Sequence, residues 1–359
     1  MRETGQFTFG ATLDMETLAG IEGGTFQGTV TYRRGYDLGE KAGLGVLQQV
    51  QEVFGRGQTW RLTQFWYQQE FEGSGIDLKF GRLTMGEDFA AFSCEFMNLT
   101  FCGSQPGNIV GDYWFNWPVS QWAARLRVEA ENDLYAQAGV FEVNPKNLEN
   151  DFTIGHFKGA TGVLLPLEVG WTPALGANRL PGTYKVGGWY NTADGDDVFL
   201  DVNREPQPVT GAPPLSRSGR YGGYVMVQQQ VTGRAEEART ISGLTLFLNL
   251  TQADRKTSRI DNQVSAGLFY TGLLQARPED VIGFAVGRTN VNARAERDFP
   301  GPRQQAEKPG AEYAAELYYG FHVAEWLILQ PNVQYIVNPG GFDHNKDIVV
   351  FGLKANLVL

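Results

Sequence analysis

Residues 81–129 bring together charged and aromatic side chains that are suited to holding a polar small molecule. They are Arg82, Glu87, Asp88, Trp114, Trp117, Arg125, Arg127 and Glu129. Charged groups supply hydrogen-bond donors and acceptors, tryptophan supplies a flat apolar surface, and ligand sites combine the two. The chain has no GxSxG, HExxH or P-loop motif, and its three histidines are scattered. We therefore expect a binding or pore-lining surface and not an enzyme.

The two cysteines of the chain, Cys94 and Cys102, lie within the same segment. In an exported protein, two cysteines at this spacing predict a disulfide that pins a loop. A redox-active dithiol is the alternative. A metal site is disfavoured because there is no CxxC motif and the histidines are scattered. We expect a structural disulfide, no bound metal and no other cofactor.

The elements that position these side chains are indicated by an alternating pattern along the whole chain. In residues 347–359, for example, Val349, Phe351 and Leu353 share one face, and Lys354 and Asn356 share the other. One wet and one apolar face also fits an ordinary antiparallel sheet. The length of the segments decides between the two, because they run about 9–13 residues, and soluble strands average about 5–6. Strands of this length are typical of a membrane-spanning barrel.

Fifteen such strands are predicted. They lie near 4–14, 24–34, 58–71, 76–84, 121–130, 133–143, 161–172, 182–191, 220–231, 240–252, 261–271, 280–289, 311–322, 325–337 and 347–359. Short connections alternate with mostly longer ones, as in outer-membrane barrels. The longest connection, 85–120, is rich in aromatic residues, so we expect it to be ordered and to fold into the lumen.

The composition favours one all-β domain over residues 1–359. Glycine occurs 45 times, aromatic residues make up 13% and charged residues 19% of the chain, which is typical of barrels or propellers. No run approaches the roughly 18 apolar residues of a membrane-spanning helix, so a membrane-spanning form must be a closed antiparallel barrel. The net charge of −10 weighs against nucleic-acid binding. A soluble propeller is the alternative, although no blade-length repeat is present.

The odd number of strands carries a further expectation. Single-chain bacterial barrels normally have an even number, with both termini in the periplasm. Either an N-terminal strand before Thr4 is missing from this chain, or one strand escapes the alternating pattern. We favour the missing strand and expect a sixteen-stranded parent. The first residues, MRETGQFTFG, show no signal peptide. A barrel of about sixteen strands is wide enough to hold an aqueous channel.

Several long motifs resemble the carbohydrate-selective porins of the OprB family. They are DMETLAGIEGGTF, QVQEVFGRGQTWRLTQFWYQQEF, GRLTMGEDFAAFSCEFMNLTFCG, YWFNWPVSQWAARLR and PNVQYIVNPGG, together with the ending VVFGLKANLVL. The motifs occur in order over nearly the whole chain. The resemblance implies a sixteen-stranded barrel in the bacterial outer membrane that passes monosaccharides such as glucose by diffusion. The implied partners are the sugar and outer-membrane lipid, and a monomer and a trimer are both left open.

The roles of single residues in such a lumen stay open at this point. Alternation from Ile76, Leu78 and Phe80 would point Arg82 at lipid. Either Gly81 marks a bulge that turns Arg82 inward, or Arg82 lies at the membrane rim. We favour the bulge, because the resemblance places this arginine beside the constriction loop.

Each of the other candidates also has an interpretation in which it does not contact substrate. Arg125, Arg127 and Glu129 face the lumen and either contact substrate or only solvate the wall. Trp114 and Trp117 are either sugar platforms or girdle aromatics, and for Trp122 the girdle is favoured. Weaker candidates, wet-facing by alternation alone, are Arg33, Lys185, Glu312, Glu316, Asn332, Gln334 and Lys354.

Two alternatives to a sugar-selective channel are kept. A general or small-acid porin could use the same barrel, and measurements of anion against sugar permeation would separate the two. A soluble glycan-binding β-protein belongs to a different class and would purify without detergent.

Overall fold

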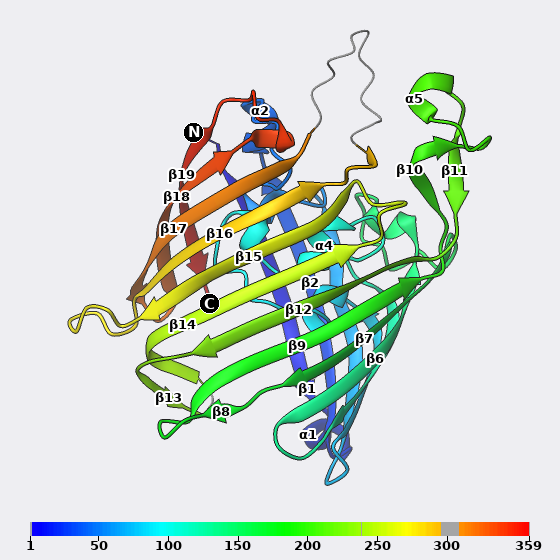
Figure 1. Ribbon diagram of the computed structural model, residues 1–359. Helices are drawn as coiled ribbons and strands as arrows, with labels where there is room; N and C mark the ends of the chain where they lie inside the picture. The colour runs from blue at the N-terminus through cyan, green and yellow to red at the C-terminus, as the bar shows by residue number, and fades with distance from the viewer. Residues whose placement is uncertain (1, 238, 296–308, 359) are drawn as a thin grey trace.

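The computed structural model describes residues 2–237, 239–295 and 309–358. Fifteen long strands in this part of the chain form one antiparallel sheet that curls around a lumen (Figure 1). They are β1 (Thr4–Asp14), β2 (Gly24–Gly35), β3 (Trp60–Phe71), β4 (Ile76–Leu83), β5 (Gln121–Glu129), β6 (Leu134–Val143), β7 (Gly162–Trp171), β9 (Leu180–Asn191), β12 (Arg220–Gln230), β14 (Arg239–Ala253), β15 (Ile260–Thr271), β16 (Val281–Val291), β17 (Ala311–Ala324), β18 (Leu327–Val337) and β19 (Ile348–Leu357). All fifteen predicted strands are confirmed, although Leu359 lies outside the described residues.

Each long strand pairs with the next long strand along the chain. Four short strands complete the set: β8 (Ala174–Leu175) and β13 (Arg234–Glu236) lie in turns, and β10 (Gly195–Asp201) pairs with β11 (Pro214–Arg217). The β10–β11 hairpin was not predicted. It stands apart from the sheet as a separate two-stranded unit above β12 (Figure 1).

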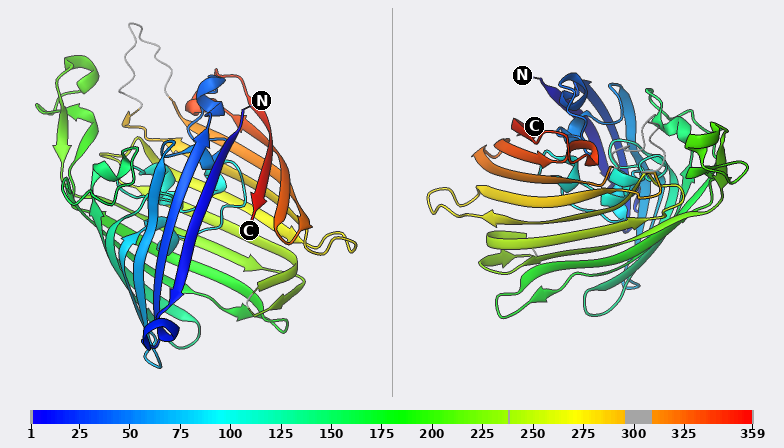
Figure 2. Two further views of the ribbon diagram at one scale, coloured as in Figure 1. Left: turned by 180° about the vertical axis from the view of Figure 1, so that it is seen from behind. Right: turned by 45° about the horizontal axis from the view of Figure 1, so that its top comes forward.

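The two edge strands of the sheet run in the same direction. This follows from an odd number of antiparallel strands, and Figure 2 shows β1 in blue and β19 in red at the two ends of the curl. The described residues include no pairing between β1 and β19.

The alternation seen in the sequence separates a lipid-facing from a lumen-facing surface. On β17 the side chains of Tyr313 and Leu317 are exposed, whereas Glu312 and Glu316 are buried on the opposite face. On β19 Phe351 is 81% exposed, consistent with an outward face that meets hydrocarbon. Outward rings also stack at the rim, as in the set Phe9, Trp60 and Tyr32.

Short helices occupy the connections. They are α1 (Met15–Ala19), α2 (Leu38–Lys41), η1 (Glu52–Phe54), α3 (Met85–Asp88), η2 (Leu99–Phe101), α4 (Gln105–Ile109), η3 (Pro145–Leu148), α5 (Gln207–Thr210) and η5 (Pro339–Gly341). In α1 the Asp14 side chain caps Glu16 and Thr17, and Gly20 ends the helix with φ 69°. Within the described residues, no helix has the length and apolar character needed to cross a membrane.

The long connection 85–120 folds into the lumen and has a core of its own. Phe96 is fully buried and contacts Phe247, Phe269 and Tyr318 of the barrel wall. Aromatic packing of this kind explains why a loop of such length is ordered, because it buries large apolar areas against the wall.

Candidate functional site

A cavity of about 2110 Å³ lies between the infolded connection and the barrel wall and continues into the opening between the edge strands β1 and β19, which are not paired with each other in the described residues. Outward-facing Phe9 and Phe351 line it at this opening. Residues of β1, β2, β9, β12, β14, β18 and β19 line it together with parts of connections 36–59 and 85–120. Its charged lining is balanced, with four basic and four acidic side chains. These are Arg2, Arg33, Lys185 and Lys354, and Glu3, Glu52, Glu87 and Glu95.

A short stretch of the infolded connection, residues 91–95, projects into this cavity, and all five of its residues line it. Side chains of the wall donate hydrogen bonds to its carbonyl groups. Lys185 Nζ donates to Ala91 O at 2.8 Å, and Gln330 Nε2 donates to Glu95 O at 2.7 Å. Backbone groups away from regular structure need such partners, so these contacts fix the path of the segment.

Two buried carboxylates of the wall accept hydrogen bonds from the backbone just outside this segment. Glu168 on β7 accepts from Ala90 N at 2.8 Å. Glu316 on β17 accepts from Met97 N at 2.8 Å and from Asn98 N at 2.7 Å. Segment 91–95 is therefore held at both ends by charge-assisted hydrogen bonds from opposite parts of the wall.

Glu168 is fully buried and its charge is stabilised by several donors. Besides Ala90 N, it accepts from Tyr135 Oη at 2.8 Å, Gln137 Nε2 at 2.8 Å and Tyr224 Oη at 2.7 Å. A buried carboxylate is tolerated when hydrogen bonds replace its water, and these four donors do so.

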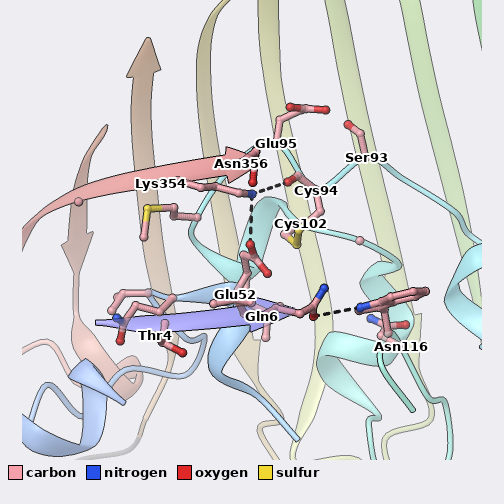
Figure 3. A pocket seen from close by; sticks show the side chains of 18 of the residues that line it. Thr4, Gln6, Glu52, Ser93, Cys94, Glu95, Cys102, Asn116, Lys354 and Asn356 are labelled. Atoms are coloured by element: carbon pink, nitrogen blue, oxygen red, sulfur yellow. Dashed lines mark hydrogen bonds and ion pairs between the residues drawn. A yellow bond between two sulfur atoms is a disulfide. The ribbon is translucent and has the colours of Figure 1, made fainter. Parts of the chain in front are cut away.

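The predicted disulfide between Cys94 and Cys102 is present. It closes a short loop within the infolded connection, and both cysteines line the cavity (Figure 3). Lys354 Nζ donates to Cys94 O at 2.8 Å and pairs with Glu52 Oε1 at 3.1 Å. A Glu52 carboxylate oxygen and both sulfurs lie within 4.8 Å of one another, but the disulfide removes the thiolates that a metal would need.

A second group of metal-ligand type, Glu149, Asp151 and His156, lies in connection 144–160. His156 Nε2 pairs with Asp151 Oδ2 at 2.9 Å. The group is away from the cavity, and two of its three residues are exposed.

Two of the predicted site residues, Glu87 and Trp117, line the cavity. Gln64 Nε2 donates to Glu87 at 3.0 Å. Desolvation of the carboxylate inside the barrel raises the pKa of Glu87 to about 7, although the positive charge of Lys79 acts in the opposite direction. Trp117 Nε1 donates to Gln6 Oε1 at 3.1 Å. This bond holds the indole at the cavity surface.

Asp88 and Arg125 lie behind this surface and do not line the cavity. Lys79 Nζ pairs with Asp88 at 3.0 Å, and Arg125 Nη1 pairs with Asp77 at 2.7 Å. The four groups join β4, β5 and α3, so they brace the segment that carries Glu87.

Arg127 and Glu129 pair with each other at 3.0 Å, near the end of β5. The Arg127 guanidinium also lies over the Tyr135 ring at 3.8 Å. Neither residue lines the cavity.

Arg82 is fully buried outside the cavity, and the predicted bulge is absent. The pairing runs through Gly81 without a shift and sets Arg82 opposite Phe65 and Trp122, on the outward side. Gly81 has φ 133°, and a Cβ there would lie 2.4 Å from Phe65 O, so glycine is needed for close strand packing.

Connection 144–160 covers the Arg82 side chain. Arg82 donates to Ser120 O at 2.6 Å, to Asn147 Oδ1 at 3.2 Å and to Thr153 Oγ1 at 3.1 Å. These bonds explain how an outward arginine is accommodated, because the connection shields it from lipid.

Trp114 is also fully buried and lies outside the cavity. It packs edge-on against Trp189 and donates through Nε1 to Ser104 Oγ at 3.1 Å. Trp122 stacks on Phe157 at the rim, in agreement with the girdle interpretation.

Alternation identified Lys185 and Lys354 as wet-facing residues, and both line the cavity. Glu52, Glu95 and Glu168 were not identified. For Glu168 a signal existed, since it is the single charge in the apolar strand sequence GVLLPLEVGW. Glu52 and Glu95 lie in irregular connections, where alternation gives no direction.

Comparisons with known proteins agree with this architecture. The family model of the carbohydrate-selective porins, OprB family, matches residues 1–359. Porin B of Pseudomonas aeruginosa is 44% identical over 99% of this chain and 82% of its own length. The putative porin QuiX of Acinetobacter baylyi is 32% identical over 99% of this chain and 83% of its own.

Among solved structures, the high-pH structure of Pseudomonas putida OprB superposes with a TM-score of 0.92 at 43% identity. The match covers 99% of this chain and 88% of that one. The chain therefore belongs to the OprB family of carbohydrate-selective porins and is an outer-membrane channel.

Proposed function

We propose that this porin passes monosaccharides such as glucose by passive diffusion, and that the sugar contacts the lumen around segment 91–95. The observation that carries the proposal is the balanced lining of the cavity, with four basic and four acidic side chains. A sugar is neutral, and each hydroxyl both donates and accepts hydrogen bonds. Adjacent opposite charges such as Lys354 and Glu52 serve both needs.

Within this lumen we assign contact roles to Glu87 and Trp117. Glu87 offers a carboxylate acceptor, and Trp117 offers an indole face for the apolar side of the sugar ring. Asp88 and Arg125 support Glu87 from behind. We assign Arg82, Trp114, Arg127 and Glu129 to the scaffold, because they bind other protein groups and do not line the cavity themselves.

A small-acid porin would be favoured by an excess of basic groups along the path, and the lining shows none. Liposome swelling with a series of sugars and organic anions tests this directly. We expect saturable glucose flux and a single-channel current that glucose blocks at millimolar concentrations. Flux that follows only solute size, or that favours the anions, would contradict the proposal.

A further inference from the structure

The outward face of β15 and β16 is apolar for most of its length but polar at one end. On β16, Phe284 and Val286 are exposed outward, and Arg288 and Asn290 continue the same face. The pairing sets Asn262 opposite Asn290 and Val264 opposite Arg288, so these side chains share that face. Figure 1 shows these strands from outside. An arginine on the lipid-facing surface of a barrel requires a physical reason.

Neighbouring amides hold Arg288 in a fixed orientation. Its Nη1 donates to Asn262 Oδ1 at 3.2 Å, and its Nη2 donates to Asn290 Oδ1 at 2.5 Å. The two amides donate in turn to Asp261 Oδ1, at 2.9 and 2.8 Å. Amide oxygens carry no net charge, and they occupy only two of the five guanidinium donors. Within the described residues Arg288 forms no ion pair.

A second guanidinium belongs to the same network. Arg255 Nε pairs with Asp261 Oδ2 at 3.0 Å, and the Arg255 side chain is 57% exposed. The five residues Arg255, Asp261, Asn262, Arg288 and Asn290, here called the outward arginine cluster, contain two arginines and one carboxylate. The cluster therefore keeps a net positive charge and guanidinium donors beyond those used within it.

The level of the cluster fits the headgroups of the external leaflet. Arg288 is paired with Tyr313, an exposed outward tyrosine, and outward Tyr335 lies on the next strand. Tyrosine rings of barrels gather where hydrocarbon meets headgroups. The cluster also lies at the strand ends that carry long connections, on the same side as the β10–β11 hairpin (Figure 1).

We propose that the outward arginine cluster binds a phosphate group of an external-leaflet lipid, that is, a phosphorylated glycolipid headgroup. Guanidinium groups match phosphate oxygens through paired N–H donors, and charge-assisted bonds of this kind are strong. The side-chain amides of Asn262 and Asn290, here called the amide fork, orient Arg288 before the lipid arrives. They thereby remove part of the entropic cost of binding. The proposal is independent of what passes through the lumen.

The test compares the natural chain with Arg288→Gln and with the control Arg34→Gln. Arg34 is also exposed and lies near the end of β2, but no amide fork holds its side chain among the described residues. The probe is lipopolysaccharide with phosphorylated lipid A, and the reference is the same lipid after enzymatic removal of its phosphates. Binding is measured in detergent by native mass spectrometry, and glucose conduction is recorded in parallel.

We expect R288Q to bind the phosphorylated lipid at least about tenfold more weakly, and R34Q to match the natural chain. Removing the phosphates from the lipid should weaken its binding to the natural chain by a similar factor. Unchanged binding by R288Q, or equal loss in R34Q, would overturn the proposal. Binding of inorganic phosphate as tightly as the lipid would also overturn the proposal.

Two further outcomes are distinguishable. Loss of an oligomer in R288Q, with lipid binding unchanged, would assign the cluster to contact between copies and overturn the lipid assignment. If R288Q does not assemble, Asn290→Ala tests the same site, because it keeps the charge and removes half of the fork. Lipid affinity equal to that of the natural chain would then refute the role of the fork.

Discussion

Glu316 on β17 accepts the backbone N–H of Asn98 at 2.7 Å, across 218 positions of sequence. Glu312, four residues earlier on the same strand and face, makes the same kind of contact with a different connection, accepting from Leu47 N at 2.7 Å. The barrel wall therefore holds its infolded connections through buried carboxylates. Of these two contacts, only that of Glu316 borders segment 91–95.

Replacing Glu316 by Gln should loosen segment 91–95. The variant amide can accept only through one oxygen, so Met97 N or Asn98 N loses its partner at a cost of about 1–3 kcal/mol. We expect the half-blocking glucose concentration to rise by roughly threefold or more, with noisier single-channel currents. Glu312→Gln is the matched control and should shift glucose block much less. Equal glucose block in the natural chain and E316Q would contradict a positioning role.

Glu87 should make ion selectivity depend on pH. Its pKa is raised to about 7, so the carboxyl is neutral below that pH and charged above it. The ratio of cation to anion permeability should therefore increase as pH rises through 7, and Glu87→Gln should abolish this increase. A pH-dependent reversal potential that persists in E87Q would assign the effect to another group.

The same raised pKa has a consequence for stability. The folded state binds the Glu87 proton more tightly than the unfolded chain does, so the stability from this group is present at low pH and is lost as pH rises through 7. The stability of E87Q relative to the natural chain should accordingly be higher at pH 8 than at pH 5. Thermal unfolding in detergent at the two pH values measures this difference.

Removing the Trp117 ring should weaken sugar binding without unfolding the barrel. Trp117→Ala loses an aromatic platform worth about 1 kcal/mol, so the half-blocking glucose concentration should rise roughly fivefold. Trp117→Phe keeps a ring and should retain most of the affinity, although it loses the bond to Gln6. Identical block in W117A and the natural chain would remove Trp117 from the sugar path.

The disulfide should stabilise the infolded connection. Replacing Cys94 and Cys102 by Ala opens a loop whose ends are 8 positions apart, and this should lower the free energy of unfolding by about 3 kcal/mol. The variant should also show faster proteolysis within residues 85–120. A variant as stable as the natural chain would mean that packing of Phe96 alone holds the connection.

Arg82→Gln should act on stability and not on transport. The variant loses bonds to Ser120, Asn147 and Thr153, which should cost about 2–4 kcal/mol. Glucose block should stay close to that of the natural chain. A large change in glucose block, with an unchanged free energy of unfolding, would indicate that Arg82 contacts the sugar.

The strands could be read from the sequence because their signal is local. Alternation over about ten residues fixes which side chains face lipid and which face the lumen, and it correctly placed Glu316 and Lys354 inward. It also gave the outward direction of Arg82, and the error came from adding a bulge to bring that residue inward. The sequence could not show that connection 144–160 covers Arg82.

The site was decided by tertiary structure. Whether a lumen-facing charge contacts substrate depends on which connection lies over it, as the difference between Glu87 and Asp88 shows. Those connections are held by hydrogen bonds such as that of Glu168 to Ala90, 78 positions apart. No periodicity encodes such pairs, because they form only when curvature of the sheet brings distant strands around one lumen.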